Sequence, residues 1–193
     1  MTNGNIYKVD VSNQTDLTKI DLLYSFNKGV SFDKATPEKK VPMTFKHELT
    51  NIIVNIKAGS GITDEDLQDI GITFTGLNTK ADFDLFESEL SNKSDEAEII
   101  PVSIVAVEGY TASFEAIIIP TDDIPDNAQI VFNLNNGDTE TGTGSDIFVW
   151  EFDREFDKST RYTYNATINR SGIVIEAIIE DWIDGGEQDI DAE

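Results

Sequence analysis

The chain has 193 residues, of which 39% are hydrophobic, so it can form one sizeable domain that buries roughly 70% of its unfolded surface. It contains no cysteine, which excludes disulfides, thiolate metal sites and a cysteine nucleophile. Lysine and arginine number 14 against 37 aspartates and glutamates, a formal net charge of -23. Such a surface repels nucleic acid and anionic lipid, so we expect no nucleic-acid partner.

The first 40 residues contain short extended pieces and a polar connector. Apolar residues at Ile6, Val9 and Val11 predict a short strand, which a polar run follows. Residues 27–40 hold four lysines, a glycine and a proline, a composition typical of a linker. We therefore predict a fragment at residues 1–26, a linker at 27–40, the main domain at 41–185 and an acidic tail at 186–193.

The stretch 41–57 carries the strongest strand signal. Apolar residues fall on one parity and then on the other: Val41, Met43, Phe45 and Leu49, with His47 at the same parity, and then Ile52, Val54 and Ile56. Because side chains of a strand alternate faces, this slip predicts a β-bulge near Thr50 and Asn51, or two strands with the chain crossing between two sheets. The only histidine, His47, is expected in the core with a satisfied hydrogen bond.

The elements downstream are mostly strands. Thr63 is placed to cap a short helical turn, residues 70–74 predict a strand that ends at Gly76, and residues 81–92 predict a strand followed by a loop. Further strands are expected at 99–107, 110–119, 128–134 and 147–156, and a closing hairpin turns at 169–172. About 7 to 10 short strands with almost no helix indicate an all-β, antiparallel sandwich, with a barrel as the alternative.

No motif in the sequence points to a reaction centre. Acidic clusters at 64–66, 122–126 and 181–184 lack the ligand spacing of a calcium loop, and residues 142–144 lack the third glycine of a nucleotide loop. We therefore predict no catalytic residue, no cofactor and no metal ligand. Trp150 and Trp182 are candidates for a glycan-binding platform, although alternating aromatic residues of a strand more often belong to the core.

Three motifs, in the right order, resemble the fimbrillin-like proteins of anaerobic gut and oral bacteria. They are Asp21-Leu-Leu-Tyr-Ser; Val41-Pro-Met-Thr-Phe-Lys-His-Glu-Leu-Thr-Asn-Ile-Ile-Val-Asn-Ile; and Tyr162-Thr-Tyr-Asn-Ala-Thr-Ile with Gly172-Ile-Val-Ile and Ile179-Glu-Asp-Trp182. The resemblance implies transthyretin-like β-sandwich domains in a non-enzymatic component of surface fimbriae. It implies export as a lipoprotein precursor to the outer membrane, assembly with other fimbrial subunits by strand exchange, and a role in pilus assembly and cell adhesion.

Under this resemblance, residues 1–26 would be the last strand of an N-terminal sandwich. The sequence shows neither a signal nor a lipidated cysteine, so we expect it to be part of a longer precursor and, in isolation, a monomer. Candidate strand-exchange residues are Ile6, Val9, Val11, Ile183 and Ile190. The tail after Trp182 offers few apolar side chains and would be a weak donor strand, which favours an accessory, tip or anchor subunit. A host protein or glycan is a further expected partner, and a glycan-binding surface module is the alternative function.

Overall fold

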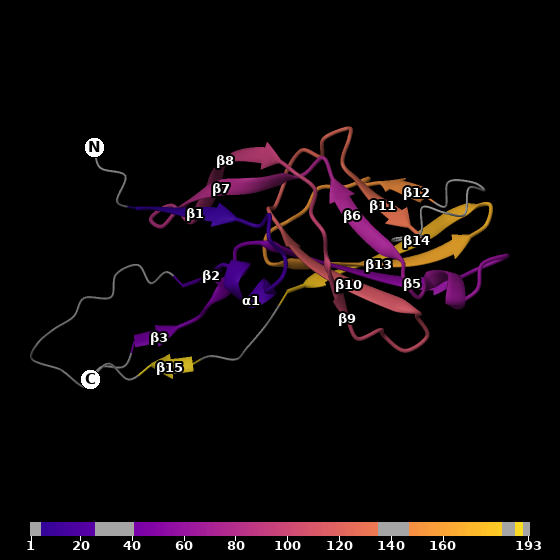
Figure 1. Cartoon of the computed structure of the whole chain (residues 1–193). Helices are drawn as coiled ribbons and strands as arrows, with labels where there is room; N and C mark the ends of the chain where they lie inside the picture. Colours follow the sequence, from indigo (N-terminus) through magenta and orange to yellow (C-terminus); the bar gives the residue numbers. More distant parts are fainter. Residues whose placement is uncertain (1–4, 26–40, 135–146, 183–187, 191–193) are drawn as a thin grey trace, which may run out of the picture.

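The computed structural model describes residues 5–25, 41–134, 147–182 and 188–190, and almost all of its regular structure is β (Figure 1). The largest sheet has five strands in the order β14 (Gly172–Asp181), β13 (Thr160–Asn169), β5 (Thr50–Ala58), β10 (Ala112–Ile118) and β9 (Val102–Ile104). A second sheet has the order β12 (Ile147–Glu151), β11 (Gln129–Asn133) and β6 (Gly71–Thr75). Among the described strands only the pairing of β5 with β13 is parallel, so the predicted antiparallel sandwich is confirmed.

Smaller elements extend one end of this sandwich (Figure 1). A three-stranded sheet has the order β1 (Ile6–Asp10), β7 (Asn78–Asp84) and β8 (Glu89–Glu96). Two-stranded sheets pair β2 (Leu23–Tyr24) with β4 (Lys46–His47) and β15 (Gln188–Ile190) with β3 (Val41–Met43). The helical elements are the four-residue α1 (Leu17–Ile20) and the short η1 (Glu65–Leu67), in which the predicted cap is present, since Thr63 Oγ1 accepts from the Asp66 N–H.

The main hydrophobic cluster fills the space between the two large sheets. Alternate residues of each strand enter it, among them Ile52, Val54, Ile56, Ile72, Phe74, Ile130, Phe132, Tyr162, Tyr164, Ala166 and Ile168. Edge-to-face contacts join the ring of Phe152 to those of Phe74 and Phe156. Each fully buried large apolar side chain contributes roughly 1.5–3 kcal/mol, so this cluster is the principal source of stability.

A second hydrophobic cluster lies where the N-terminal segment meets the five-stranded sheet. Its buried members come from five regions of the chain and are Val9, Val11, Leu49, Ala81, Phe83, Ile117, Ile119 and Trp182. Strands β5 and β10 are therefore buried on both faces near this end: Ile118 points into the main cluster and Ile117 into the second.

The parity change in residues 41–57 corresponds to a break in the strand. The chain divides into β3, β4 and β5, with Leu49 in the second cluster and Ile52 in the main one, which matches the predicted crossing between layers. The prediction that Phe45 faces the core is wrong, because its side chain is 43% exposed. Phe45 lies between two very short strands, β3 and β4, each paired to a single neighbour, and no further strand of the described residues pairs with either.

The path from β6 into β7 contains a similar change of parity. Ile72 and Phe74 are buried before it, and Ala81 and Phe83 after it. Gly76 lies at the change with φ 73°, and a Cβ at this position would come within 2.5 Å of the Asn127 carbonyl oxygen. The bend therefore requires glycine both for its backbone angle and for the close approach.

Gly76→Ala is expected to lower the free energy of unfolding by about 2–4 kcal/mol, because it adds a steric conflict to the strain of a left-handed backbone. Gly109→Ala is the matched control, since Gly109 has φ 87° but nothing within 4 Å of the added Cβ. It should cost only about 1–2 kcal/mol. Urea denaturation measures the free energy of unfolding of both variants. Equal losses of stability would show that the close contact between residue 76 and the Asn127 carbonyl is unimportant.

Two local predictions for the chain were incomplete. Residues 89–92, expected as loop, begin β8, which pairs with β7 through mostly exposed polar side chains. A strand with two solvated faces has no apolar alternation, so its sequence pattern cannot be told from a loop. Helix α1 was also not predicted, since it is one turn within a polar run.

Candidate assembly surface

Among the residues that the structure describes, the surfaces best suited to bind another polypeptide are the outer edges of the two large sheets. β14 and β9 are the outer strands of one sheet, and β12 and β6 of the other. Along β14, Val174, Ile178 and Ile179 are each about half exposed. Exposed β-branched side chains beside free main-chain donors and acceptors are the features by which one sheet recruits a further strand.

A groove of about 600 Å³ separates the edges of β6 and β9. It is lined by residues of three segments, 68–73, 100–106 and 111–114. Ile72 and Phe114 also belong to the main cluster, so the groove lies over its margin. Val105, in the turn that follows β9, is 92% exposed beside it. The groove is thus an opening between the two layers of the sandwich, bordered on both sides by sheet edges.

Pairing across this opening stops after a single bridge. Phe74 and Ile99 exchange both main-chain hydrogen bonds, with N–O distances of 2.8 and 2.9 Å. In an antiparallel ladder the next such pair would be Ile72 with Pro101, and proline has no N–H to donate. The chain instead joins the other sheet, where Val102 pairs with Glu115, and among the described residues the Ile72 main chain has no partner on this side.

In the five-stranded sheet, a side chain takes the place of a strand beside the other end of β10. β9 pairs only as far as Glu115, so Ile117 of β10 has no strand beside it there. Gln14, which is 3% exposed, fills that place: its Nε2 donates to the carbonyl oxygens of Val11 (2.6 Å) and Ile117 (2.9 Å), and the Ile117 N–H donates to its Oε1 (2.9 Å). The amide of Gln14 therefore takes the hydrogen bonds that a neighbouring strand would make.

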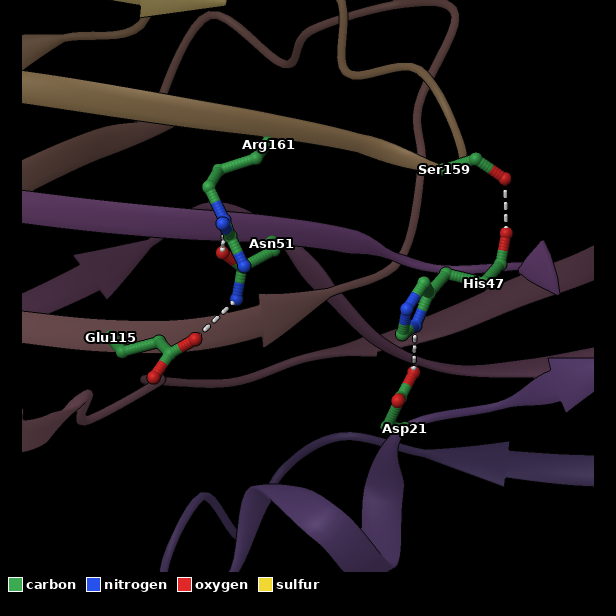
Figure 2. A network of polar contacts seen from close by, with 6 residues as sticks. All are labelled: Asp21, His47, Asn51, Glu115, Ser159 and Arg161. Carbon is green, nitrogen blue, oxygen red and sulfur yellow. Dashed lines mark hydrogen bonds and ion pairs between the residues drawn. The ribbon is translucent and has the colours of Figure 1, made fainter. Parts of the chain in front are cut away.

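The single histidine lies between Asp21 of the N-terminal segment and Ser159, just before β13 (Figure 2). His47 is 2% exposed, its Nδ1 lies 2.9 Å from Asp21 Oδ1, and the Ser159 hydroxyl donates to its main-chain carbonyl. The indole of Trp182 stacks on the imidazole with ring centroids 3.7 Å apart. The predicted core position of His47 and its hydrogen bond are confirmed.

A chain of polar contacts crosses three neighbouring strands on the face turned away from the main cluster (Figure 2). Arg161 Nε of β13 donates to Asn51 Oδ1 of β5, and Asn51 Nδ2 donates to Glu115 Oε1 of β10, both at 2.8 Å. Asn51 is fully buried, and these bonds satisfy both ends of its amide. The arrangement aligns strands and contains no nucleophile with an adjacent base, so we assign it a structural role.

The two tryptophans proposed for a glycan platform lie in different surroundings. Trp182 is 5% exposed and lies in the second cluster, so it presents no face to solvent. Trp150 is half-buried against Phe152 and Tyr164. Trp182 is thus part of the interior, whereas Trp150 packs against the margin of the main cluster.

Of the residues proposed for strand exchange, Ile6 and Val9 lie in β1, Val11 follows it and Ile190 lies in β15. Val9 and Val11 are buried in the second cluster, and Ile6 is half-buried at the start of β1, which pairs only with β7. Ile190 lies in β15, where its main chain pairs with Val41 of β3. The side chain of Ile190, and all of Ile183, fall outside the described residues.

An ion pair links β1 to its neighbour. Lys8 Nζ lies 2.5 Å from Asp82 Oδ1, and Asn92 Nδ2 donates to Asp82 Oδ2 at 3.1 Å. Hydrogen bonds from Lys8 and then from Asn92 hold the pKa of the Asp82 carboxyl below its ordinary value of 3.8. A carboxyl whose pKa is lowered by folding stabilises the fold at every pH above its ordinary pKa. This contribution disappears as the pH falls through the lowered pKa.

Lys8→Met is therefore expected to raise the pKa of Asp82 towards 3.8. The difference in stability between this variant and the parent chain should be present at neutral pH and vanish in strong acid. An NMR titration of the Asp82 carboxyl measures the shift, with Lys57→Met in another sheet as the control. No change of the Asp82 pKa in Lys8→Met would contradict the pairing of the two side chains.

The described part of the chain contains neither a cluster of metal ligands nor a membrane-spanning helix. No group of three or more histidine, aspartate or glutamate side chains there could hold a metal ion. No helix within residues 5–25, 41–134, 147–182 and 188–190 is long and apolar enough to cross a membrane.

The model of the family described as fimbrillin-like matches residues 2–182. The chain belongs to the fimbrillin-like family. A curated relative, named as a candidate fimbrium subunit, Fim1C, of Bacteroides uniformis, is 27% identical over 191 residues. That alignment covers 96% of this fimbrillin-like chain and 58% of the relative.

Solved structures share the fold of this fimbrillin-like chain. A candidate cell adhesion protein from Bacteroides uniformis superposes with a TM-score of 0.75 and 25% identity, over 95% of this chain and 68% of the other. A candidate cell adhesion protein from Bacteroides ovatus gives a TM-score of 0.71 at 22% identity, over 96% and 63%. The fimbrillin-like chain thus spans just under or just over two thirds of these longer proteins.

Proposed function

We propose that this chain is a non-enzymatic structural subunit of bacterial surface fimbriae, which acts by binding other subunits in pilus assembly and cell adhesion. The observation that carries the proposal is the set of outer sheet edges, unpaired among the described residues and with exposed β-branched side chains, in a chain of the fimbrillin-like family. The relative named as a candidate fimbrium subunit supports the same assignment. The buried amide of Asn51 binds the side chains of Arg161 and Glu115, an arrangement that suits a structural role.

Within a fibre, we assign the chain to an accessory, tip or anchor position, reached as a lipoprotein precursor at the outer membrane. Terminal strands β1 and β15 are each held by one neighbour, which suits exchange with another subunit. The division into an N-terminal remnant at 1–26, a linker at 27–40, a domain at 41–185 and a tail at 186–193 belongs to this proposal. The isolated chain would be a monomer, and a host protein or glycan a further partner at the cell surface.

Quantitative mass spectrometry of fimbriae sheared from cells that express the gene tests this function. An accessory component should co-purify with the fibres at less than about one copy for every ten stalk subunits, and antibodies should label fibre ends. Deletion of the gene should leave the stalk protein expressed. Absence of the chain from purified fibres would refute the fimbrial function, and a stoichiometry equal to that of the stalk would refute the accessory position.

A further inference from the structure

We propose that a polar pocket beside β4 binds an acidic sugar, one that carries a single negative charge as a carboxylate or a sulfate. The inference rests on the proposed function, in which a glycan is a further partner, and gives that partner a location and a chemical class. Four parts of the chain meet at this pocket: the end of the N-terminal segment, β4, the turn between β7 and β8, and the residues just before β13. None of the described residues that line it borders the groove between β6 and β9.

The lining of the pocket is polar throughout. Its volume is about 490 Å³, within the range of small-ligand sites, and every described residue around it has a polar side chain. Hydroxyl groups of serine and threonine come from Ser25, Thr44, Ser88 and Ser159. Because a hydroxyl both donates and accepts hydrogen bonds, these groups can bind the hydroxyls of a sugar. Tyr24 adds an aromatic ring, against which the C–H face of a sugar can pack.

Positive charge predominates in this pocket, which Lys46 and Lys158 line together with Glu48, although the chain as a whole has 14 basic residues against 37 acidic ones. Lys158 is paired with Glu48, and Lys46 makes no ion pair with the described residues. One anionic group of a ligand can therefore approach the Lys46 ammonium. A second anionic group would meet the carboxylates of the adjoining pocket. These belong to Glu87, Glu89, Asp122 and Asp157.

The ammonium of Lys158 is held in place by a buried carboxylate. Glu48 is 5% exposed, and its Oε2 accepts from Lys158 Nζ at 2.8 Å. The Ser88 carbonyl oxygen accepts from the same ammonium at 3.3 Å. These two bonds use two of the three donors of the ammonium, so the third can donate to a ligand in the pocket that Lys158 lines. A buried carboxylate is costly, and here it fixes the position of a donor.

Two serines of the pocket have a backbone conformation that is rare for residues with a side chain. Ser88 has φ 60° and Ser159 has φ 56°, and they are two of the four non-glycine residues with positive φ in the described part of the chain. Both lie against Lys158, one through its carbonyl and the other as the next residue. The Ser159 hydroxyl donates to the His47 carbonyl (Figure 2), so its oxygen can still accept. Strained positions collect at binding sites, which supports a binding role for this pocket.

An NMR titration of the isotope-labelled protein tests the inference. The acidic probes are glucuronic acid, N-acetylneuraminic acid and galactose 6-sulfate, and the controls are galactose, for hydroxyls alone, and acetate, for charge alone. We expect at least one acidic sugar to bind with a Kd of about 1 mM, and both controls to bind at least about tenfold more weakly. The acidic sugar that binds identifies the anionic group as carboxylate or sulfate. Amide shifts should move at Lys46, Ser88 and Ser159, and added salt should weaken binding.

Three variants locate the site. Lys46→Met removes an exposed ammonium without an ion pair to a described residue, so the fold should tolerate it, and it should weaken binding of the acidic sugar at least about tenfold. Thr44→Val, also exposed, removes one hydroxyl at nearly constant volume and should weaken binding about threefold. Lys93→Met is the matched control, since Lys93 lines the adjoining pocket and not this one, and it should leave binding unchanged.

Several results would overturn the inference. They are the lack of binding of every acidic sugar at tens of millimolar, binding of acetate as tight as that of the sugars, equal binding by Lys46→Met and the parent chain, or shifts confined to the adjoining pocket around Asp122. If the chain is nevertheless found in purified fibres, the inference alone fails and the fimbrial function stands. If an acidic sugar binds in the pocket but the chain is absent from fibres, the fimbrial function fails and the pocket remains a sugar site.

Discussion

Replacement of Trp182 by alanine should lower the free energy of unfolding by about 3–5 kcal/mol, the range found for buried aromatic residues. The indole is 5% exposed, packs in the second cluster and stacks on His47. Its loss would leave a cavity where β4, the end of β14 and the N-terminal segment meet. Thermal and urea denaturation, followed by circular dichroism, measure the change.

Trp150→Ala is the matched control for this prediction. Trp150 is half-buried, with Phe152 and Tyr164 as neighbours, so its truncation should cost clearly less, about 1–2 kcal/mol. The two variants also distinguish a structural role from glycan recognition. If Trp182→Ala retained full stability, the packing of the second cluster described above would be incorrect, and a binding role for the indole would become the better explanation.

Gln14→Met should lower the free energy of unfolding by about 2–5 kcal/mol, although methionine has nearly the same volume. The substitution removes the hydrogen bonds to the N–H and carbonyl of Ile117 and to the Val11 carbonyl. Buried main-chain groups without partners cost about 1–3 kcal/mol each. Urea denaturation gives the total, and hydrogen exchange of the Ile117 amide, which should accelerate, locates the cause.

Asn13→Ala provides the comparison for Gln14. Asn13 is exposed and its side chain accepts only from its near neighbour Thr15. Its loss should cost less than about 1 kcal/mol. Similar small losses for both variants would mean that the edge of β10 does not depend on Gln14.

The strands that bury one face were predictable from the sequence. Residues 70–74, 128–134 and 162–168 alternate apolar and polar side chains, and each lies in a strand close to the expected position. The parity change within 41–57 also indicated the passage between layers. These patterns reflect a local requirement, since every second side chain must face the core.

The candidate assembly surface was not predictable in the same way. Gln14 lies in a polar run, and its importance depends on Ile117, which is 103 residues away. The free edge at Ile72 exists because the residues after Pro101 pair with β10 and not with β6. Phe45 is exposed because no further strand of the described residues covers its short neighbours. Pro101 was the one local signal for the groove, because proline ends a ladder wherever it falls. Pairings between distant segments leave no trace in the periodicity of either segment.

Residue-resolved hydrogen exchange of the free protein tests the open edge most directly, because Ile72 and Phe74 are two residues apart on the same strand. Phe74 donates its N–H to Ile99, whereas the Ile72 main chain faces the groove. After correction for intrinsic rates, the Ile72 amide should exchange at least about tenfold faster than that of Phe74. Equal protection of the two amides in the free protein would mean that the edge of β6 is already occupied, and the account of an open groove would be wrong.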